Sequence, residues 1–440
     1  MSTNDKSPDT ALTEAQRAAI VDAPVGIAPD PDTPNLLGKG MPNEVGDHIR
    51  AYVQRVRGGE MGALPAVAGL ILLMVIFSFA DPVFLTERNM ANLFNQSAEF
   101  ITIGMALVFV LLLGEIDLSA GVTFGVAMSI FVRLTQPDGM AWPLALLLAL
   151  GIGFVIGFVI GFFVAKIGVP SFVVTLGLFL GLQGVIIMII GPGGTYTVIP
   201  GPIKAIQNQN LPVWAGWALL VVVLALLLGV ALWDRARRTR SGAPNPPISI
   251  MYMKLGAIAL IGAAVVYFLN LDRGTKLKEL QGVPIVVPIV LLLLLVGTFV
   301  LDRTRYGRYL YAIGGNPEAA RRSGVNVTFI KWAAFCTCST LAVVAGLFSV
   351  SRVGSVSGST GVDIVLSGVA AAVVGGVSLF GGRGRLIHAV IGALVIAVIT
   401  NGLGLLNLPA GATLGVSGGV LIIAATVDAL ARRRSGAVRI

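Results

Sequence analysis

Apolar runs recur along most of the chain, from Gly62 to Leu430, and short polar segments separate them. Each run is close to the roughly 20 residues with which an α-helix crosses a bilayer. The runs are continuous, without the alternation of membrane β-strands, so a β-barrel is excluded. The pattern predicts an all-α, polytopic membrane protein of about 10–12 transmembrane helices, some of them broken or re-entrant. The predicted spans are 62–80, 94–114, 118–134, 142–165, 171–190, 211–233, 251–270, 284–301, 329–350, 362–380, 386–407 and 411–430.

One apolar stretch is too long for a single crossing. The segment from Ile101 to Val132 is interrupted only by residues 114–119, GEIDLS. A single helix over this segment would be about 48 Å long, against a hydrocarbon core of roughly 30 Å. The chain therefore breaks here, and Asp117 and Ser119 are candidate N-caps of the next helix. Broken backbone at membrane depth is tolerated only against protein or a water-filled cavity, so the break indicates a pathway.

The polar side chains within the apolar runs are candidates for lining that pathway, because ionisable groups inside a membrane are costly. The carboxylates at such depth are Glu99, Glu115, Asp117 and Asp363. Three alternatives are open for Glu115 and Asp117: they brace the helix break, touch a polar solute, or carry a coupled proton. Asn401 and Gln183 form either interhelical hydrogen bonds or solute contacts. The predicted pathway and break residues are Glu115, Asp117, Ser119 and Asn401.

Composition and charge support a membrane protein with one defined orientation. Only 12% of the residues are charged, whereas a soluble domain carries roughly 25%. The net charge of +9 comes largely from basic residues in loops beside spans, which is typical of cytoplasmic loops rather than of nucleic-acid binding. This bias predicts that both termini lie in the cytoplasm. The basic residues on that side are Lys166, Arg235, Arg237, Arg238, Arg240, Arg303, Arg305, Arg308, Arg321, Arg322, Arg383, Arg385, Arg432, Arg433 and Arg434.

The same patterns divide the chain into regions. Residues 1–60 are polar and rich in proline, which predicts a disordered cytoplasmic tail. The transmembrane domain spans 61–432. Within it, 234–283 is an appended unit that begins with a basic, proline-rich loop, and 302–328 is a polar cytoplasmic loop. Residues 433–440 form a second cytoplasmic tail.

No enzyme chemistry is indicated by the sequence. It contains no phosphate-binding GxxxxGK[ST] motif, no HExxH and no GxSxG. The two cysteines, Cys336 and Cys338, lie within an apolar run without nearby histidine or carboxylate, which does not make a metal site. We therefore predict no catalytic residues, no metal and no cofactor.

The polar loop contains the signals of a short helix. Asn316 and Pro317 suit the N-cap and first helical positions, and Glu318 would lie at the positive end of the helix dipole. Alanine and arginine follow, and Gly324 suits the C-terminal stop. The pattern predicts a two-turn helix on the membrane surface. By itself, it fits either an ordinary linker helix or an element that docks a cytoplasmic partner.

Four motifs in order resemble those of the monosaccharide permeases of bacterial ATP-binding-cassette importers. They are GEIDLS (114–119), VPSFVVTL (169–176), YGRYLYAIGGNPEAARRSGV (306–325) and VVGGVSLFGGRG (373–384). The resemblance covers most of 62–430, and the additional loop and span near 234–270 is similar to the xylose branch of the family.

The resemblance implies a homodimer of permeases in the bacterial cytoplasmic membrane, surrounded by lipid. It also implies two cytoplasmic ATPase subunits, an extracytoplasmic sugar-binding protein and transport by alternating access. ATP hydrolysis would then take place on the partner subunits. An alternative is a proton-coupled secondary transporter that uses Glu115 or Asp117. The resemblance places the ATPase-docking element at Asn316, Pro317, Glu318, Ala319, Ala320, Arg321 and Gly324.

Overall fold

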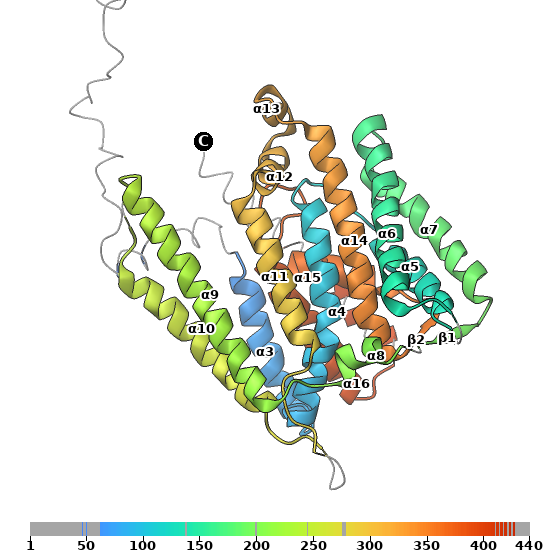
Figure 1. Cartoon of the computed structure of the whole chain (residues 1–440), viewed down its shortest axis with the longest axis horizontal. Coiled ribbons are helices and arrows are strands. Elements are labelled where there is room, and N and C mark those ends of the chain that lie inside the picture. Colours follow the sequence, from blue (N-terminus) through green and yellow to red (C-terminus); the bar gives the residue numbers. More distant parts are fainter. Residues whose placement is uncertain are drawn as a thin grey trace, which may run out of the picture.

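The computed structural model consists almost entirely of helices (Figure 1). It describes residues 46, 50, 62–136, 139–198, 200–243, 245–274, 279–409, 411, 412, 414–416, 418, 419, 422, 423 and 426. The predicted tails, 1–60 and 433–440, lie outside these residues apart from two positions. The helices are α3 (Leu64–Ala80), α4 (Glu87–Leu111), α5 (Ala120–Leu134), α6 (Trp142–Gly161), η1 (Phe162–Ile167), α7 (Ser171–Ile190), α8 (Gly201–Asn208), α9 (Val213–Arg240), α10 (Ile248–Leu269), α11 (Val286–Arg303), α12 (Arg305–Gly315), α13 (Pro317–Arg322), α14 (Val327–Val353), α15 (Val362–Val374) and α16 (Leu386–Leu405).

The prediction of an all-α membrane fold is confirmed. In the described part of the chain, eight helices are long and apolar enough to cross a membrane, counting α6 and η1 as one continuous helix. Three shorter apolar helices, α3, α5 and α15, correspond to further predicted spans. The last predicted span, 411–430, is described at too few positions to compare.

One helix begins earlier in the sequence than the predicted span does. The expected helix 94–114 starts at Glu87, because Thr86 serves as its N-cap and accepts a hydrogen bond from the backbone N–H of Asn89 at 3.4 Å. The first two turns are rich in polar residues, so the apolar pattern used for the prediction begins only after them. Some of them are exposed, such as Asn92, while Asn89 is buried against another helix.

Helices α4 and α14 form the centre of the bundle. In their apolar windows, 83% and 72% of the residues are buried, compared with 6% and 0% in α9 and α10. Helix α14 packs against α4, α5 and α6, while α4 also contacts α15, α16 and α11. Figure 1 shows the two central helices enclosed by the others, with α9 and α10 as a separate pair at one side. Polar residues on the central helices are therefore held inside the protein.

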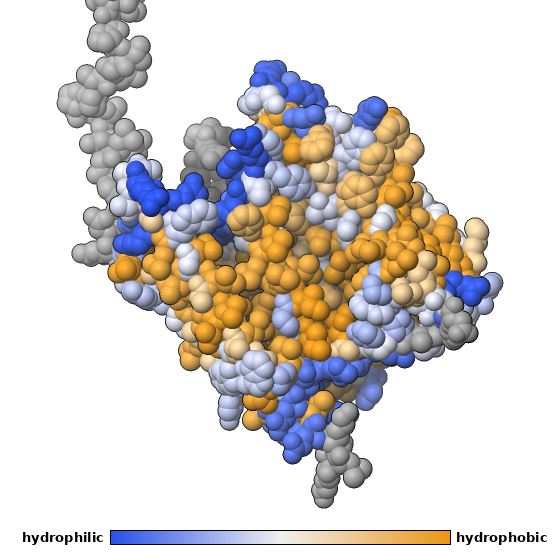
Figure 2. Space-filling model, in the orientation of Figure 1, coloured by the Kyte–Doolittle hydropathy of each residue, from blue (hydrophilic) through white to orange (hydrophobic). Residues whose placement is uncertain are grey.

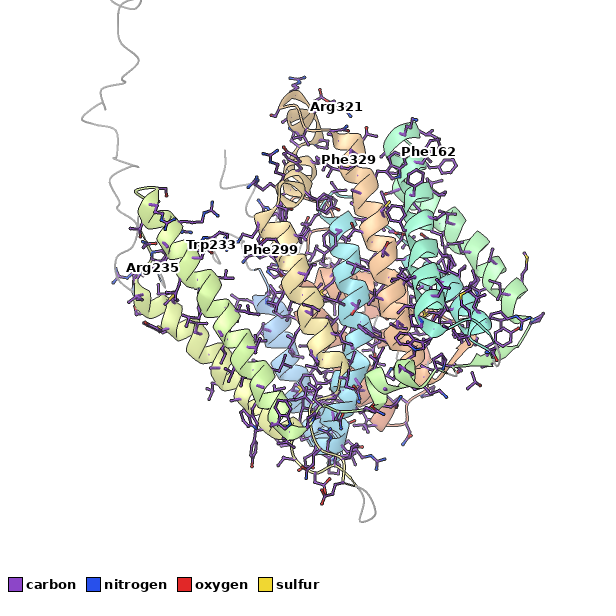
Figure 3. The ribbon with its side chains drawn as sticks, viewed as in Figure 1. Phe162, Trp233, Arg235, Phe299, Arg321 and Phe329 are labelled. Atoms are coloured by element: carbon purple, nitrogen blue, oxygen red, sulfur yellow. The ribbon has the colours of Figure 1, made fainter. Side chains whose placement is uncertain are left out.

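The surface has an apolar band between two polar ends (Figure 2). One end carries α13 and the end of α9, where Arg321 and Arg235 are labelled in Figure 3. The arginines of α9 and α11 lie in the last turns of their helices, where cations interact favourably with the helix dipole. This end is called the basic end below. Its charge agrees with the predicted orientation.

The segment 235–240 corrects the predicted loop at the start of the appended unit. It forms the last turns of α9, because arginine is a good helix former and suits a helix C-terminus. Asp234 forms an ion pair with Arg303 of α11 and so connects α9 to the bundle at the basic end. The rest of α9 and α10 remains largely exposed.

Three short elements near the opposite end, two strands and a helix, were not predicted. Strand β1 (Thr195–Thr197) pairs antiparallel with β2 (Ser355–Ser357). Helix α8 lies against the end of α14, where the Gln207 backbone N–H donates to Ser351 Oγ at 3.2 Å. These contacts connect the segment after α7 to the segment after α14.

Glycines set the close approach of α6 and α14, which gives a first prediction. A Cβ at Gly157 would lie 2.7 Å from Cα of Cys336, so Gly157→Ala should force the helices apart. Overpacking of this kind costs roughly 1–3 kcal/mol. We expect a lower unfolding temperature for the purified protein by thermal scanning. Gly151→Ala is the matched control, since nothing lies within 4 Å of that position. Equal unfolding temperatures would contradict the proposed close packing.

Candidate functional site

The predicted helix break is present between α4 and α5. Helix α4 ends at Leu111 and α5 begins at Ala120, with Ser119 at the N-cap position. The Ser119 side chain forms no cap bond. The Asp117 carboxylate accepts hydrogen bonds from Ser119 N at 2.9 Å and Ser119 Oγ at 2.7 Å. Asp117 is fully buried, so these bonds stabilise a carboxylate that would otherwise be costly inside the protein.

Side chains from two other helices also hold the break in place. Glu115 forms an ion pair with Lys331 of α14. At Ile116, the backbone N–H donates to Ser171 Oγ at 3.2 Å, and the carbonyl oxygen accepts from Thr175 Oγ1 at 3.3 Å. Breaking the helix frees backbone groups, and the start of α7 satisfies two of them. This geometry favours the bracing role among the three alternatives for Glu115 and Asp117.

Asn401 lies far from the break. Its side chain exchanges two hydrogen bonds with Asn89, of 2.9 and 3.0 Å, and both residues are buried. Asn89 is near the start of α4, and the break follows its end at Leu111, about 33 Å further along the helix. Gln183 donates to the carbonyl of Gly358. Asn401 therefore makes an interhelical contact, whereas Gln183 connects α7 to the loop after β2. Asn401 is not part of one site with Glu115, Asp117 and Ser119.

A buried ion pair on the central helices was not predicted. Arg352 Nη2 lies 2.6 Å from Glu99 Oε1, and Glu99 is only 2% exposed. The sequence indicated Glu99 as a carboxylate at membrane depth but not its partner, which is 253 residues away. The alignment of α4 with α14 that brings the two together depends on tertiary packing.

The predicted docking helix is present as α13, and its local signals are confirmed. The Asn316 side chain accepts from the backbone N–H of Ala319 at 3.0 Å. Glu318 stands in the first turn and pairs with Arg322 at 3.3 Å. Gly324 follows the helix with φ of +81°, a conformation that favours glycine. In Figure 3, Arg321 lies at the outermost tip of the basic end.

A second short helix, α12, precedes α13 and was not predicted as a separate element. Thr304 caps it by accepting from Gly307 N at 3.3 Å. Its buried residues, Gly307, Leu310 and Ile313, lie on one face, so the helix rests against the bundle. Spacings of three residues repeat along one side of a helix, and this signal was available in the sequence.

The end of α12 meets the helix break where several glycines pack around the backbone of Leu112. We call this contact the glycine junction, and it consists of Leu112, Gly114, Gly314, Gly381 and Gly382. The Gly382 backbone N–H donates to the carbonyl of Leu112 at 2.9 Å. A Cβ at Gly314 would overlap that same carbonyl oxygen. Gly114 and Gly381 have positive φ, and a Cβ at Gly381 would be 2.8 Å from the Gly114 nitrogen. Three chain segments thus touch through backbone alone.

Tyr311 adds a side-chain connection beside this glycine junction. Its hydroxyl donates to the carbonyl of Gly384 at 2.8 Å, in the loop between α15 and α16. Burial raises the pKa of Tyr311 above its ordinary value, so the hydroxyl keeps its proton and acts as a donor. Helix α12 is therefore tied both to the break after α4 and to the glycine-rich loop before α16.

These features define a class of protein: a membrane-embedded transport subunit with an intramembrane helix break and projecting basic helices. Within the described residues, no group of histidine, cysteine and carboxylate side chains could hold a metal ion. The helices and the break are typical of a transporter.

Comparisons with known proteins identify the family. The family described as "Branched-chain amino acid transport system / permease component" matches residues 89–244 and 245–425, and the chain belongs to it. The xylose transport system permease protein XylH of Escherichia coli K12 is 34% identical over 370 residues, which cover 84% of this chain and 92% of the relative. XylH of Haemophilus influenzae is 32% identical over 363 residues, covering 82% and 94%.

A further relative names a different sugar. The ribose import permease protein RbsC of Escherichia coli K12 is 29% identical over 368 residues, covering 82% of this chain and 92% of the relative. No solved structure matches the chain. These relatives are permeases, so the prediction of a transporter subunit rather than an enzyme is confirmed.

Proposed function

We propose that this chain is the membrane-spanning subunit of an ATP-binding-cassette importer for a monosaccharide, D-xylose or a similar sugar. The observation that carries the proposal is the similarity to xylose permeases over 84% of the chain. The projecting α12–α13 pair supports it, because a subunit without its own ATP site needs a surface through which an ATPase can act. A neutral sugar also agrees with a bundle in which Glu99 and Glu115, two of the few carboxylates at membrane depth, are each paired with a cation.

The proposal includes an assembly in the bacterial cytoplasmic membrane, with both termini on the cytoplasmic side. Two copies of the chain would pair within the lipid, two ATPase subunits would bind at the basic end, and a sugar-binding protein would deliver substrate at the other. The ATPase-docking residues are Asn316, Pro317, Glu318, Ala319, Ala320, Arg321 and Gly324. The break residues are Glu115, Asp117 and Ser119, whereas Asn401 joins α16 to the start of α4 through Asn89.

Transport would proceed by alternating access. ATP binding closes the two ATPase subunits, α12 and α13 move with them, and the glycine junction passes this movement to the break after α4. Rigid-body movements of packed elements are the usual form of such transitions. The bracing of Glu115 by Lys331 favours a structural role for that carboxylate over proton transfer.

Reconstituted uptake tests this function. We expect labelled xylose to enter proteoliposomes only when the ATPase subunit, ATP and the loaded binding protein are all present. Uptake that continues without the ATPase and collapses with the proton gradient would instead establish the proton-coupled alternative.

Charge reversal on α13 tests the docking surface. The Glu318 side chain is 58% exposed at the start of the helix. Glu318→Lys places a cation at the positive end of the dipole and removes the pairing with Arg322, so we expect the ATPase to be recovered at least about fivefold less on affinity purification. Glu87→Lys, at the exposed first turn of α4, is the matched control. Equal ATPase recovery from the two variants would refute the docking role.

A further inference from the structure

The chain breaks a second time at membrane depth, between α14 and α15. Helix α14 ends at Val353, near the end of the bundle opposite the basic end, and α15 begins at Val362. The segment between them, 354–361, contains strand β2 and then turns back into the bundle. A Cβ at Gly361 would lie 2.1 Å from the carbonyl oxygen of Gly121, the second residue of α5. The segment therefore reaches as deep as the start of α5.

The two breaks are arranged alike. One ion pair joins Glu115, just after α4, to Lys331 near the start of α14, and a second joins Glu99 of α4 to Arg352 at the end of α14. The two central helices are therefore antiparallel, and each is followed by a break and a short helix. Helix α5 runs toward β1, whereas α15 runs toward the glycine junction. Transporters with inverted repeats bind their solutes where such broken helices meet.

The carboxylate of Asp363, in the first turn of α15, belongs to a residue near the middle of the bundle's depth. A Cβ at Gly368 would come within 2.8 Å of the Ile103 side chain and 3.0 Å of the Leu107 side chain, so α15 is level with α4 there. Both helices run toward the glycine junction, and Asp363 precedes Gly368 by five residues, or about 8 Å. Asp363 is therefore about level with Glu99, the middle residue of α4.

This part of the chain presents polar groups on the surface of a single copy. Asp363 and Ser359 are exposed, and Ser367 is partly exposed one turn after Asp363. The Ser359 hydroxyl lies 3.3 Å from the hydroxyl of Ser357. Among the residues that the structure describes, none forms an ion pair with Asp363 or donates to its carboxylate. Carboxylate and hydroxyl groups thus lie exposed at the depth of the hydrocarbon core.

Two independent observations indicate that this face does not border lipid. Ionisable side chains inside a membrane face the bundle interior or a water-filled cavity, because facing hydrocarbon is costly. Broken backbone such as 354–361 is likewise tolerated only against protein or water. Gln183 of α7 holds this segment in place, since its side-chain amide donates to the carbonyl of Gly358. The face is therefore a fixed polar surface in contact with water.

We propose that Asp363, Ser359 and Ser367 line the path of the sugar at its midpoint. This inference rests on the proposed function and names residues that meet the solute. A carboxylate accepts hydrogen bonds from two neighbouring hydroxyls of a monosaccharide, and serine hydroxyls both donate and accept. Water takes these places when no sugar is bound. The second copy in the proposed pair supplies the opposite wall.

The reactivity of introduced cysteines tests whether water reaches this face. The two native cysteines are buried, so the unmodified chain supplies the background. In nanodiscs, we expect Ser359→Cys and Ser367→Cys to react with a positively charged methanethiosulfonate. Leu226→Cys, in the middle of the exposed helix α9, is the matched control for a lipid-facing position. It should react at least about tenfold more slowly, because only the thiolate reacts and apolar surroundings keep the thiol protonated.

Neutralising the carboxylate tests its contact with the sugar. Hydrogen bonds to a charged group are about twice as strong as those to a neutral one, so Asp363→Asn should lower ATP-dependent xylose uptake about tenfold. Recovery of the ATPase and the unfolding temperature should stay unchanged. Glu87→Gln, which removes an exposed carboxylate from the first turn of α4, should transport normally.

Three results would overturn the assignment. The introduced cysteines could react no faster than Leu226→Cys, which would mean that the second copy packs directly on this face. Asp363→Asn could transport like Glu87→Gln. It could also lose uptake only in proportion to a lower unfolding temperature, which would make Asp363 a structural residue of α15. Cysteine reactivity does not depend on the energy source, so ATPase-independent uptake would refute the importer and leave the water-filled face in place.

Discussion

Substitution of Gly314 by alanine is expected to lower coupled sugar uptake at least about tenfold while the complex with the ATPase still assembles. Gly314 is the second-to-last residue of α12, and a Cβ there would overlap the carbonyl oxygen of Leu112. The added methyl would separate α12 from the break after α4. It would also crowd the Gly382 nitrogen, 2.5 Å away, which donates to the same carbonyl.

The size of this effect follows from the role of the junction. In the proposed mechanism, the position of α12 changes the conformational equilibrium of the break. Coupling free energies between two such sites are typically about 1–3 kcal/mol, which changes an equilibrium constant roughly 5–150-fold. Gly314→Ala should therefore lower uptake per ATP hydrolysed by at least about tenfold in proteoliposomes. Basal ATPase activity and recovery of the complex should change little, because α13 is left intact.

Gly315 provides the control for this experiment. It is the next residue of the same helix, it is exposed, and nothing lies within 4 Å of a Cβ at that position. Gly315→Ala should transport sugar normally, although it changes the helix propensity by the same amount. If both variants transport equally well, the glycine junction does not carry the movement. If Gly314→Ala fails to bind the ATPase, its effect is on assembly instead.

Features set by neighbouring residues could be predicted from the sequence. The start of α5 followed from the length of an apolar run and from Asp117 and Ser119 beside one another. The cap of α13 followed from Asn316 and Pro317, and its end from Gly324. These signals act within a few residues, so one sequence is enough to show them. The hydrogen bonds at the break differ in detail from the prediction. Ser119 occupies the N-cap position of α5, but its side chain donates to Asp117 instead of capping the helix.

Features that depend on how distant helices align could not be predicted. The glycine junction joins Leu112, Gly314 and Gly382, and its contacts are between backbone atoms that carry no sequence signature. The pairing of β1 with β2 rests on three residues in each strand, too few to distinguish from a loop. The predicted grouping of Asn401 with the break also rested on polarity alone, and only the packing of α16 on α4 places Asn401 beside Asn89.

Substitution of Arg352 by glutamine is expected to destabilise the protein strongly, and more than Glu99→Gln or Arg385→Gln does. Glu99 is 2% exposed on the central helix α4, and Arg352 is the partner of its carboxylate at 2.6 Å. Without the guanidinium, a carboxylate would remain inside the bundle with no opposite charge. Leaving one member of a buried pair uncompensated costs about 3–5 kcal/mol. A marked fall in the unfolding temperature of the purified protein in nanodiscs should report this loss.

Neutralising Glu99 and neutralising Arg352 should reduce the stability by different amounts, because the two side chains differ in exposure. The Arg352 side chain is 32% exposed, so Glu99→Gln leaves a cation that water can still reach, and it should cost less than Arg352→Gln. The double variant removes both charges and should recover most of the stability. Arg385→Gln is the control, because its pair with Asp302 is exposed and should contribute only about 0–1 kcal/mol. An Arg352→Gln protein as stable as Arg385→Gln would mean that water reaches Glu99, and the central helices would then border an aqueous path.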